Sequence, residues 1–195
     1  MNETDSSDAE LIHAIVLGSQ DAFVELYRRW QHDVYRFAYA MAKSGGVAED
    51  VTQDVFLNLL QNARRFDPSR GTVRAWLFGC ARHAILDRLR SERRWVHDLP
   101  DEGSEACQSE QRVLEQQRLG KLHAAIVDLP FEYREAIVLC ELEEMSYAEA
   151  AVVLACPIGT VRSRLHRARA LLVARLRCTE SEDGSSLLGA GGACS

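Results

Sequence analysis

The spacing of apolar residues constrains the fold of this 195-residue chain more than any other feature of its sequence. Along nearly every long segment these residues recur at steps of three and four, which is the period of an amphipathic helix. No alternating pattern of apolar and polar residues persists that would indicate a β-strand. Hydrophobic residues make up 47% of the chain, so the helices can bury a core. The sequence therefore predicts an all-α protein.

Four helices are predicted in the first half of the chain. Gly18 ends the first, Ser44-Gly45-Gly46 ends the second, and the loop Phe66–Gly71 follows the third. The predicted helices span about Asp8–Leu17, Ser19–Lys43, Val47–Arg65 and Thr72–Arg94. Residues expected to face inward from the third helix are Val51, Val55, Phe56, Leu59 and Leu60. These helices can close one core, so we expect a domain over residues 8–95.

The second half of the chain predicts another small helical domain, over residues 113–177, after a linker. Residues 96–112 are acidic, carry Pro100 and Gly103, and lack bulky apolar spacing, which is typical of a flexible linker. The predicted helices span about residues 113–128, 131–142, 147–155 and 160–177. Ser146 and Glu149 have the spacing of a capping box at the start of the third. Residues 178–195 are expected to form a disordered tail.

The formal net charge of −6 at pH 7 by itself argues against a nucleic-acid-binding protein. The charge is unevenly distributed, however. The segment Arg70–Arg94 is rich in arginine, with only Asp87 and Glu92 against it. The segment Pro157–Arg177 is also rich in arginine and contains no acid. Because salt limits the reach of an exposed charge to about 10 Å, local patches decide what binds a phosphate backbone. An acidic chain with two basic segments can therefore still bind DNA.

The second basic segment has the pattern of a helix-turn-helix. Tyr147–Ala155 and Thr160–Arg177 are helices joined by a tight turn, and the second is strongly basic. The second helix of such a unit enters the major groove, where its N-terminal residues meet base edges. Residues expected to contact duplex DNA are Thr160, Arg162, Ser163, His166, Arg167 and Arg169, because Val161, Leu165 and Ala168 step inward. An ordinary amphipathic helix with a solvated basic face is the alternative.

Aromatic residues accompany the arginines of the first basic segment. They are Phe66, Trp76, Phe78 and Trp95. Bases of single-stranded DNA stack on aromatic rings while arginines bind the backbone, so this composition suits melted DNA or a flipped base. Trp76 is more simply explained as a core residue, whereas Phe66 and Trp95 are more open. The helix before the loop carries an acidic, polar face over Glu49–Phe56, which suits either a docking surface or plain solvation.

Together these segments resemble the extracytoplasmic-function sigma factors, the smallest members of the sigma-70 family. The matching elements occur in that family's order, separated by a linker, over about residues 10–95 and 113–177. They are Asp21-Ala22-Phe23, Ala48–Phe56, Arg65–Pro68 followed by Ala75-Trp76-Leu77, and Cys156–Arg169. The resemblance implies two small helical domains joined by a flexible linker, the second a helix-turn-helix (winged-helix-like) DNA-binding domain.

The resemblance also implies a role for each surface. Core RNA polymerase would bind Asp50, Gln53, Asp54, Phe56 and Leu57. The minus-ten promoter element would be recognised and melted, with a flipped base held at the loop, by Phe66, Asp67, Ser69, Arg70, Arg74, Arg82 and Arg88. The outer face of the helix from Thr160 would read the minus-thirty-five element as duplex. The acidic linker would thread toward the polymerase active-site channel. An anti-sigma factor is an expected partner, and the free protein is expected to be a monomer.

No constellation typical of an enzyme or a metal site is readable. The six cysteines include no Cys-X-X-Cys pair and no His lies at zinc-finger spacing, so we expect no metal, no cofactor and no catalysis. An acidic N-terminus and the lack of an apolar run of about 20 residues favour a cytoplasmic protein without membrane insertion. Two alternatives stay open: a stand-alone helix-turn-helix regulator, and a sigma mimic that titrates an anti-sigma factor. The acidic linker and net charge predict weak DNA binding until polymerase holds the domains apart.

Overall fold

The computed structural model describes residues 7–42, 44–92 and 120–186, without the side chains of residues 91–92 and 178–186. All regular structure in these ranges is helical and they contain no strand, so the all-α prediction is confirmed and no β wing occurs there. The first half contains α1 (Asp8–Val16), α2 (Gln20–Ala42), α3 (Gly45–Asn62), η1 (Ala63–Arg65), η2 (Pro68–Arg70) and α4 (Val73–Glu92). The second contains helical residues 120–127, α6 (Phe131–Ile137), the π-helical turn η3 (Val138–Leu142), α7 (Tyr147–Leu154) and α8 (Ile158–Ser186).

Serine caps begin helices in both halves of the chain. At α1 the Ser7 amide donates to the Glu10 carboxylate (2.8 Å), and the Glu10 amide donates to Ser7 Oγ (3.3 Å). The predicted capping box at α7 is confirmed: the Ser146 amide donates to Glu149 (3.1 Å) and the Glu149 amide to Ser146 Oγ (3.2 Å). A cap of this kind contributes about 1 kcal/mol, because it satisfies amides that the helix itself leaves unpaired. Gly18, at φ +92, follows the end of α1.

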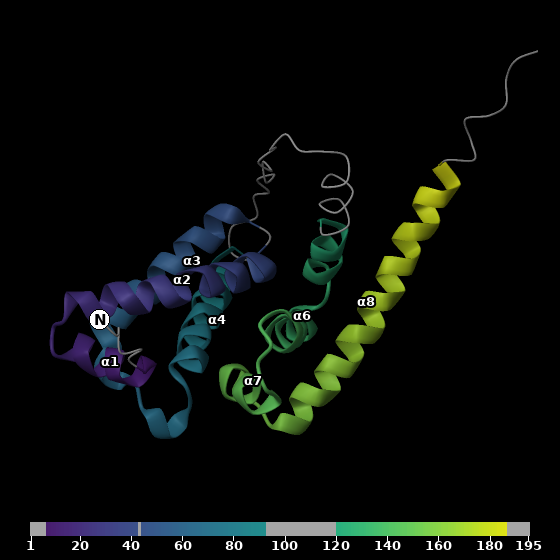
Figure 1. Cartoon of the computed structure of the whole chain (residues 1–195). Helices are drawn as coiled ribbons and strands as arrows, with labels where there is room; N and C mark the ends of the chain where they lie inside the picture. The colour runs from purple at the N-terminus through teal and green to yellow at the C-terminus, as the bar shows by residue number, and fades with distance from the viewer. Residues whose placement is uncertain (1–6, 43, 93–119, 187–195) are drawn as a thin grey trace, which may run out of the picture.

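The core of the first domain lies between α2, α3 and α4, which pack on one another (Figure 1). Phe37 of α2 and Phe78 of α4 are fully buried, and their ring centroids are 5.2 Å apart. On α3 the buried stripe advances from Phe56 to Leu59, and Leu60 is 51% exposed. The prediction that Leu60 faces inward is therefore wrong. Consecutive helical residues are about 100° apart around the axis, so the residue after Leu59 leaves the core face.

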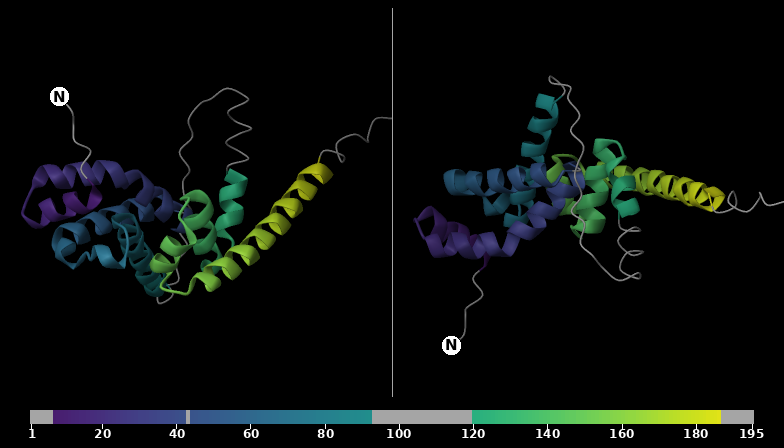
Figure 2. Two further views of the ribbon diagram at one scale, coloured as in Figure 1. Left: turned by 60° about the horizontal axis from the view of Figure 1, so that its bottom comes forward. Right: turned by 90° about the horizontal axis from the view of Figure 1, so that it is seen from above.

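The helix α8 is longer than predicted. It begins at Ile158 rather than Thr160 and continues through Ser186 instead of ending near Arg177 (Figure 1). Residues 178–186, which were predicted to belong to a disordered tail, continue α8 instead. Residues 187–195 and the predicted linker, residues 96–112, lie outside the described ranges. In both views of Figure 2, α8 projects away from the body of the protein.

The two domains pack directly against each other. Helix α4 of the first domain lies against α7 of the second, and α2 lies against α6 and η3. Figure 2 shows the same neighbourhood from two sides, with the second domain placed against one end of the first. The second domain therefore covers part of α4, which carries several of the arginines expected to bind DNA.

Candidate nucleic-acid interface

The outer face of α8 carries the residues expected to contact duplex DNA. Val161, Leu165 and Ala168 are buried, as predicted, and this fixes which side of the helix faces outward. The expected contacts that are exposed to solvent are Arg162, Ser163, His166, Arg167 and Arg169. Thr160, at the start of the series, is half-buried. The exposed face combines cations with groups that hydrogen-bond base edges, which is what a major groove accepts.

Aromatic side chains of neighbouring helices hold two of these arginines. The Arg162 guanidinium lies 5.7 Å from the centre of the Tyr147 ring of α7, a cation–π contact. Arg167 donates a long hydrogen bond (3.5 Å) to the Tyr133 hydroxyl of α6, and this bond raises the pKa of Arg167, which stays cationic. Contacts between exposed groups are weak, so both guanidinium groups can exchange these partners for a phosphate or a base.

Two further side chains of this face already have protein partners. Arg169 forms an ion pair with Glu141 of η3, and both side chains are exposed. The Ser163 hydroxyl donates to the Thr160 carbonyl oxygen (3.0 Å), so toward DNA it offers an acceptor rather than a donor.

The loop between α3 and α4 is ordered by its own residues. The Asp67 carboxylate accepts hydrogen bonds from the Ser69 amide (2.9 Å) and the Ser69 hydroxyl (2.7 Å), and so caps η2. These hydrogen bonds hold the pKa of Asp67 below its usual value, so the carboxylate is charged at neutral pH. Gly71 has φ +153 and ψ −179, a conformation that is almost confined to glycine. The shape of the loop is therefore set before any ligand binds.

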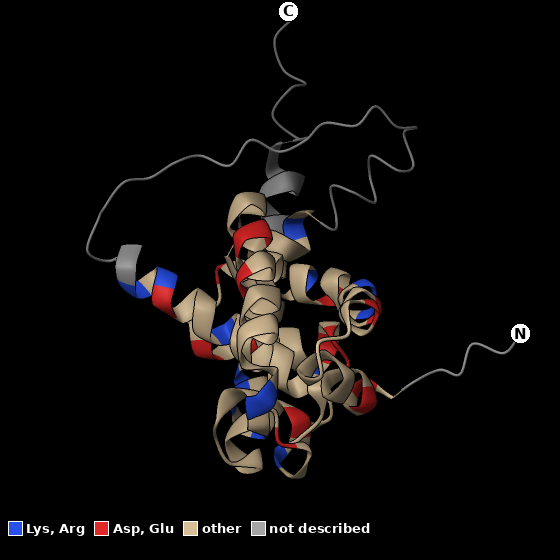
Figure 3. Ribbon diagram, turned by 90° about the vertical axis from the view of Figure 1, so that its left-hand side faces the viewer, with Lys and Arg blue, Asp and Glu red and all other residues tan. Residues whose placement is uncertain are grey.

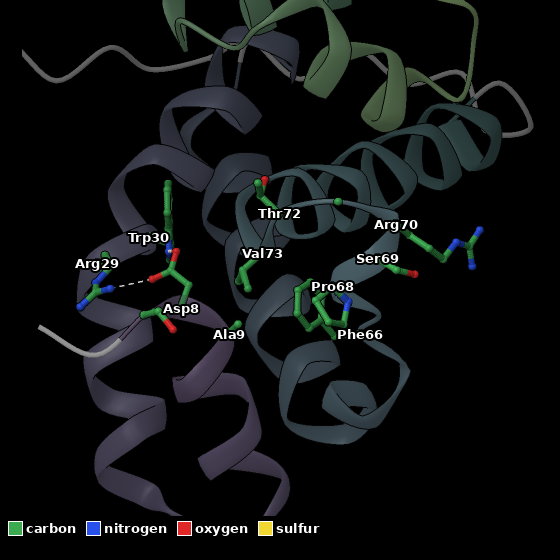
Figure 4. Close-up of a pocket in the computed structure, with 12 residues that line it drawn as sticks. Asp8, Ala9, Arg29, Trp30, Phe66, Pro68, Ser69, Arg70, Thr72 and Val73 are labelled. Atoms are coloured by element: carbon green, nitrogen blue, oxygen red, sulfur yellow. Dashed lines mark hydrogen bonds and ion pairs between the residues drawn. The ribbon is translucent and has the colours of Figure 1, made fainter.

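A pocket of about 880 Å³ lies between this loop and helices α1 and α2 (Figure 4). Trp30, Phe66 and Val73 supply apolar surface to its lining. The Asp8 carboxylate accepts from Trp30 Nε1 (2.9 Å) and pairs with Arg29 (2.7 Å), which fixes the indole at the pocket. A lining of aromatic rings with a few placed polar groups suits a planar, unstacked base.

Ser69 and Arg70 line the same pocket on the side of the loop. Figure 4 shows the Arg70 side chain pointing away from the pocket, toward solvent. From there its guanidinium can meet a DNA backbone whose base occupies the pocket. Ser69 uses its hydroxyl proton for Asp67, so its free capacity is that of an acceptor.

The aromatic residues of this segment divide into two groups. Phe66 meets Trp76 edge-on, with ring centroids 5.9 Å apart, and both rings are half-buried. The interpretation of Trp76 as a core residue is therefore only partly correct. Phe78 is fully buried against Phe37 and is not a stacking surface. Trp95 lies outside the described residues.

Two of the α4 arginines expected at the minus-ten element are engaged by the second domain. Arg74 donates to the Glu143 carbonyl oxygen and lies 3.9 Å from the Glu143 carboxylate. Arg82 forms an ion pair with Glu135 of α6. Figure 3 shows acidic and basic positions interspersed along the helices rather than separated on different faces. Sequence reasoning missed these acidic partners, which are 69 and 53 residues from the arginines that they pair with.

The third expected arginine of α4 links that helix to α3. Arg88 pairs with Asp54 (2.8 Å) and lies 3.6 Å from a carboxylate oxygen of Asp50. Both aspartates are more than half exposed. The structure therefore joins a residue expected at DNA with two residues expected at polymerase, and Arg88 belongs with the α3 surface.

The outer face of α3 combines acidic residues with exposed leucines. Asp50, Gln53 and Asp54 are exposed on it, and Leu57 is 54% exposed. Phe56, which was expected to contact polymerase, is 3% exposed and packs edge-on against Tyr27 at 4.7 Å.

Phe56 is therefore a core residue, as its apolar spacing predicted, and Leu57 lies about 100° further around the helix axis, outside the core face. The exposed Leu60 extends the outer face instead. From the sequence, only its angular position around the helix axis could have identified Leu60 as a surface residue. Leu57 and Leu60 lie three residues apart on α3, so both exposed side chains are within reach of one protein partner.

No group of three or more His, Cys, Asp or Glu side chains that could hold a metal ion occurs among the described residues. Cys80, Cys140 and Cys156 are free, half-buried thiols, and burial raises the pKa of Cys80 to about 11. A helix long and apolar enough to cross a membrane is likewise lacking over the described ranges.

The two helical domains, one with an aromatic-lined pocket at the α3–α4 loop and one with a helix-turn-helix, define a two-domain DNA-binding protein. Residues 26–95 match the family Sigma-70 region 2, and residues 119–172 match Sigma-70, region 4. The chain is 34% identical over 174 residues to the ECF RNA polymerase sigma factor SigC of Mycobacterium tuberculosis (strain CDC 1551 / Oshkosh), which covers 87% of this chain and 93% of SigC.

Two other similarities agree. The ECF RNA polymerase sigma factor SigE of Mycolicibacterium smegmatis is 35% identical, with 83% of this chain and 64% of SigE covered, so the chain spans under two thirds of that relative. The structure of CnrH in complex with the cytosolic domain of CnrY matches with a TM-score of 0.68 and 29% identity, over 89% of this chain and 99% of CnrH. The chain belongs to the extracytoplasmic-function sigma factors of the sigma-70 family, as the sequence resemblance predicted.

Proposed function

We propose that this chain binds core RNA polymerase and directs it to promoters, with each domain taking one promoter element. The observation that carries the proposal is the combination, in one chain, of a pocket with aromatic walls at the α3–α4 loop and an exposed basic helix in a helix-turn-helix. A stand-alone regulator needs the second feature but has no use for a pocket that takes a base out of the duplex.

The division of labour follows the predicted domains. Residues 8–95 form the region 2 domain, which binds polymerase and recognises and melts the minus-ten element. Residues 113–177 form the region 4 domain, which reads the minus-thirty-five element. Residues 96–112 connect them, and residues 178–195 follow as a tail whose first part continues α8. The role is one of binding and positioning, and polymerase supplies the chemistry.

At the minus-ten element, the pocket beside Phe66 would hold a flipped non-template base. The Asp67–Ser69 hydrogen bonds keep the loop in one shape, so little entropy is lost when the base enters. Trp30, which sequence reasoning did not single out, joins Phe66 as a second aromatic wall. Arg70 would bind the backbone at the rim.

At the minus-thirty-five element, the exposed face of α8 would enter the major groove. Arg162, Ser163, His166 and Arg167, which are exposed, would meet base edges, while Arg169 and the half-buried Thr160 would meet the backbone. Polymerase would cover the outer face of α3, formed by Asp50, Gln53, Asp54, Leu57 and the newly identified Leu60.

A protein that sequesters the chain is a further expected partner. CnrH, which resembles this chain at 29% identity, was solved with the cytosolic domain of CnrY bound to it. By analogy we propose that an anti-sigma factor binds this chain. We further propose that the chain acts in the cytoplasm, where polymerase and promoter DNA are found, and that it is monomeric when free.

Mixing the purified chain with core RNA polymerase of its own host and following both on a sizing column tests this function. We expect one-to-one co-elution, with a known sigma factor as the positive control. Failure to co-elute while the control succeeds would overturn the proposal and would favour a stand-alone regulator, for which direct duplex binding is the next test.

A further inference from the structure

A second pocket, of about 550 Å³, adjoins the α3–α4 loop between helices α4 and α7, and we call it the α4–α7 pocket. Phe66, Arg70, Gly71 and Thr72 of the loop line this pocket and also the pocket of Figure 4, so the loop separates the two. Helices α4 and α7, which pack on each other, supply the other walls. Its volume falls in the range of ligand pockets, which are frequent between domains.

One face of α4 forms the first wall of the α4–α7 pocket. Trp76, Gly79, Cys80 and His83 line it, at the spacing of residues that lie above one another on a helix. Trp76 is half-buried and meets Phe66 edge-on, and no ring of the described part of the chain stacks on its face. Burial raises the pKa of Cys80 to about 11, so at neutral pH this thiol is an uncharged part of the wall.

The packing of the described residues does not require glycine at position 79. Gly79 lies inside α4, where glycine is less favourable than alanine because its backbone loses more conformational freedom. A Cβ added at Gly79 would meet nothing within 4 Å among the described residues, so α7 does not need the space. A glycine also lets a ligand approach the backbone closely, and this use remains for Gly79.

The α7 wall of the pocket is apolar and consists of small side chains. Ala151, Val152, Val153 and Ala155 line it. Val152 closes one end, since a Cβ added at Gly71 would lie 3.4 Å from a methyl carbon of Val152. One buried apolar cluster includes residues of both domains, and it holds α4 and α7 in place. The space between an aromatic wall and an apolar wall suits a planar ring.

The rim of the α4–α7 pocket carries more positive than negative charge. Arg65 and His83 are exposed there, and Arg65 forms no ion pair with any residue that the structure describes. Arg70 lines the pocket from the loop. Asp67 is the one acidic residue of the described lining, and its carboxylate already accepts from the Ser69 amide and hydroxyl. This set of groups favours an anionic ligand, because guanidinium groups bond phosphate and carboxylate strongly.

We propose that the α4–α7 pocket binds a nucleotide, with the base between Trp76 and α7 and the phosphate at Arg65 and His83. Gly79 lets the base lie against the helix backbone. The nucleotide belongs either to a single strand of DNA, whose neighbouring base would lie across Phe66 in the pocket of Figure 4, or to a free mononucleotide, and the experiment separates these sources. Only the DNA source rests on the proposed function.

The test follows the indole N–H signal of Trp76 in the NMR spectrum of the full, ¹⁵N-labelled chain. The chain has three tryptophans, and Trp76→Phe identifies the signal. The probes are a short single-stranded oligonucleotide of mixed sequence, the same strand without its bases, and a mixture of deoxynucleoside monophosphates. We expect the signal to move with the intact strand, with the monophosphates or with both. It should not move with the abasic strand, which has no base to stack on the indole.

Gly79→Ala gives two readouts that a purely structural glycine would not combine. Because alanine favours the helix and would meet no neighbour, the melting temperature should rise by about 2–4 °C. The added methyl group would occupy the pocket, so the Kd from the Trp76 signal should rise several-fold. Gly120→Ala is the matched control, since a Cβ there also meets nothing within 4 Å among the described residues and Gly120 does not line the pocket. The control should bind the probes as the wild type does.

Arg65→Gln and Arg64→Gln form a second matched pair. The two arginines are exposed neighbours in η1, and only Arg65 lines the pocket. With whichever probe moves the Trp76 signal, Arg65→Gln should raise the Kd several-fold and Arg64→Gln by a smaller factor. Equal effects would contradict a phosphate site at Arg65.

The probes identify the source of the nucleotide. A response to the strand alone identifies DNA, and a response to the monophosphates alone identifies a free nucleotide. No movement of the Trp76 signal with either probe would overturn the proposal. An equal response to the abasic strand, or an unchanged Kd in the folded Gly79→Ala variant, would overturn it as well. Co-elution with polymerase depends on none of these results, so a failure of the proposed function is recognised separately.

Discussion

Replacing the two exposed leucines of α3 by alanine should weaken polymerase binding without unfolding the protein. Leu57 is 54% exposed and Leu60 is 51% exposed, so about half of each side chain remains to be buried by a partner. Since a fully buried leucine contributes about 1.5–3 kcal/mol, truncating two half-exposed ones should cost about 2 kcal/mol of binding energy, or roughly a 30-fold rise in Kd.

A titration of fluorescently labelled chain with core polymerase measures this effect. Leu17→Ala is the matched control, because Leu17 is 75% exposed and the chemical change is the same. Both proteins should unfold at nearly the wild-type urea concentration, since exposed substitutions usually change stability by less than about 0.5 kcal/mol. The control should bind polymerase as the wild type does.

The reasoning fails if the double variant of Leu57 and Leu60 binds polymerase with wild-type affinity. It fails equally if Leu17→Ala weakens binding by the same factor. The first result would mean that α3 does not carry the docking surface, and the second that the loss of binding is not specific to α3.

Three further predictions concern the core, a thiol and the reading helix. Phe78→Ala should lower the free energy of unfolding by about 3–5 kcal/mol in a urea titration, and a small effect would contradict the described core. Val173→Ala is the control, because Val173 is 48% exposed and its truncation should leave the free energy of unfolding nearly unchanged. Burial raises the pKa of Cys80 to about 11, so its alkylation at pH 8 should be about a hundredfold slower than that of a thiol with a pKa of 9. The alkylation rate should rise about tenfold per pH unit, and a rate that levels off near pH 9 would refute this. Arg162→Ala should weaken minus-thirty-five binding by about 1–3 kcal/mol and relax the preference at one base pair; an equal loss on all sequences would instead indicate a phosphate contact.

The helix-turn-helix was predictable because its signals are local. The Ser146–Glu149 capping box marks the start of α7, and the spacing of Val161, Leu165 and Ala168 fixes which face of α8 points inward. Each of these signals depends on residues a few positions apart, where helical geometry alone decides the outcome. The order of the motifs along the chain then sufficed for the family.

Helical phase limited the prediction of the polymerase surface. The apolar spacing placed Phe56 inward, which its burial confirms, whereas the family resemblance placed Phe56 and its neighbour Leu57 together on the polymerase surface. The same spacing wrongly placed Leu60 in the core. Only the packing of Phe56 against Tyr27 settles which residues face outward.

The contacts between the domains had no local signal at all. Arg82 and Glu135 are 53 residues apart, and Arg36 and Glu143 are 107 residues apart. The arginines of α4 lie in a segment whose composition is typical of DNA binding, and nothing in the sequence indicated which acidic residues they would pair with. Pairing at such separations is determined by the tertiary arrangement.

Run-off transcription with core polymerase of the same host tests the central claim most directly. The template set is fragmented genomic DNA of that host, transcribed with and without the purified chain. The account predicts discrete transcripts that appear only when the chain is added and that share upstream elements at minus-ten and minus-thirty-five. An identical transcript pattern with and without the chain, alongside a known sigma factor that works in the same assay, would contradict it.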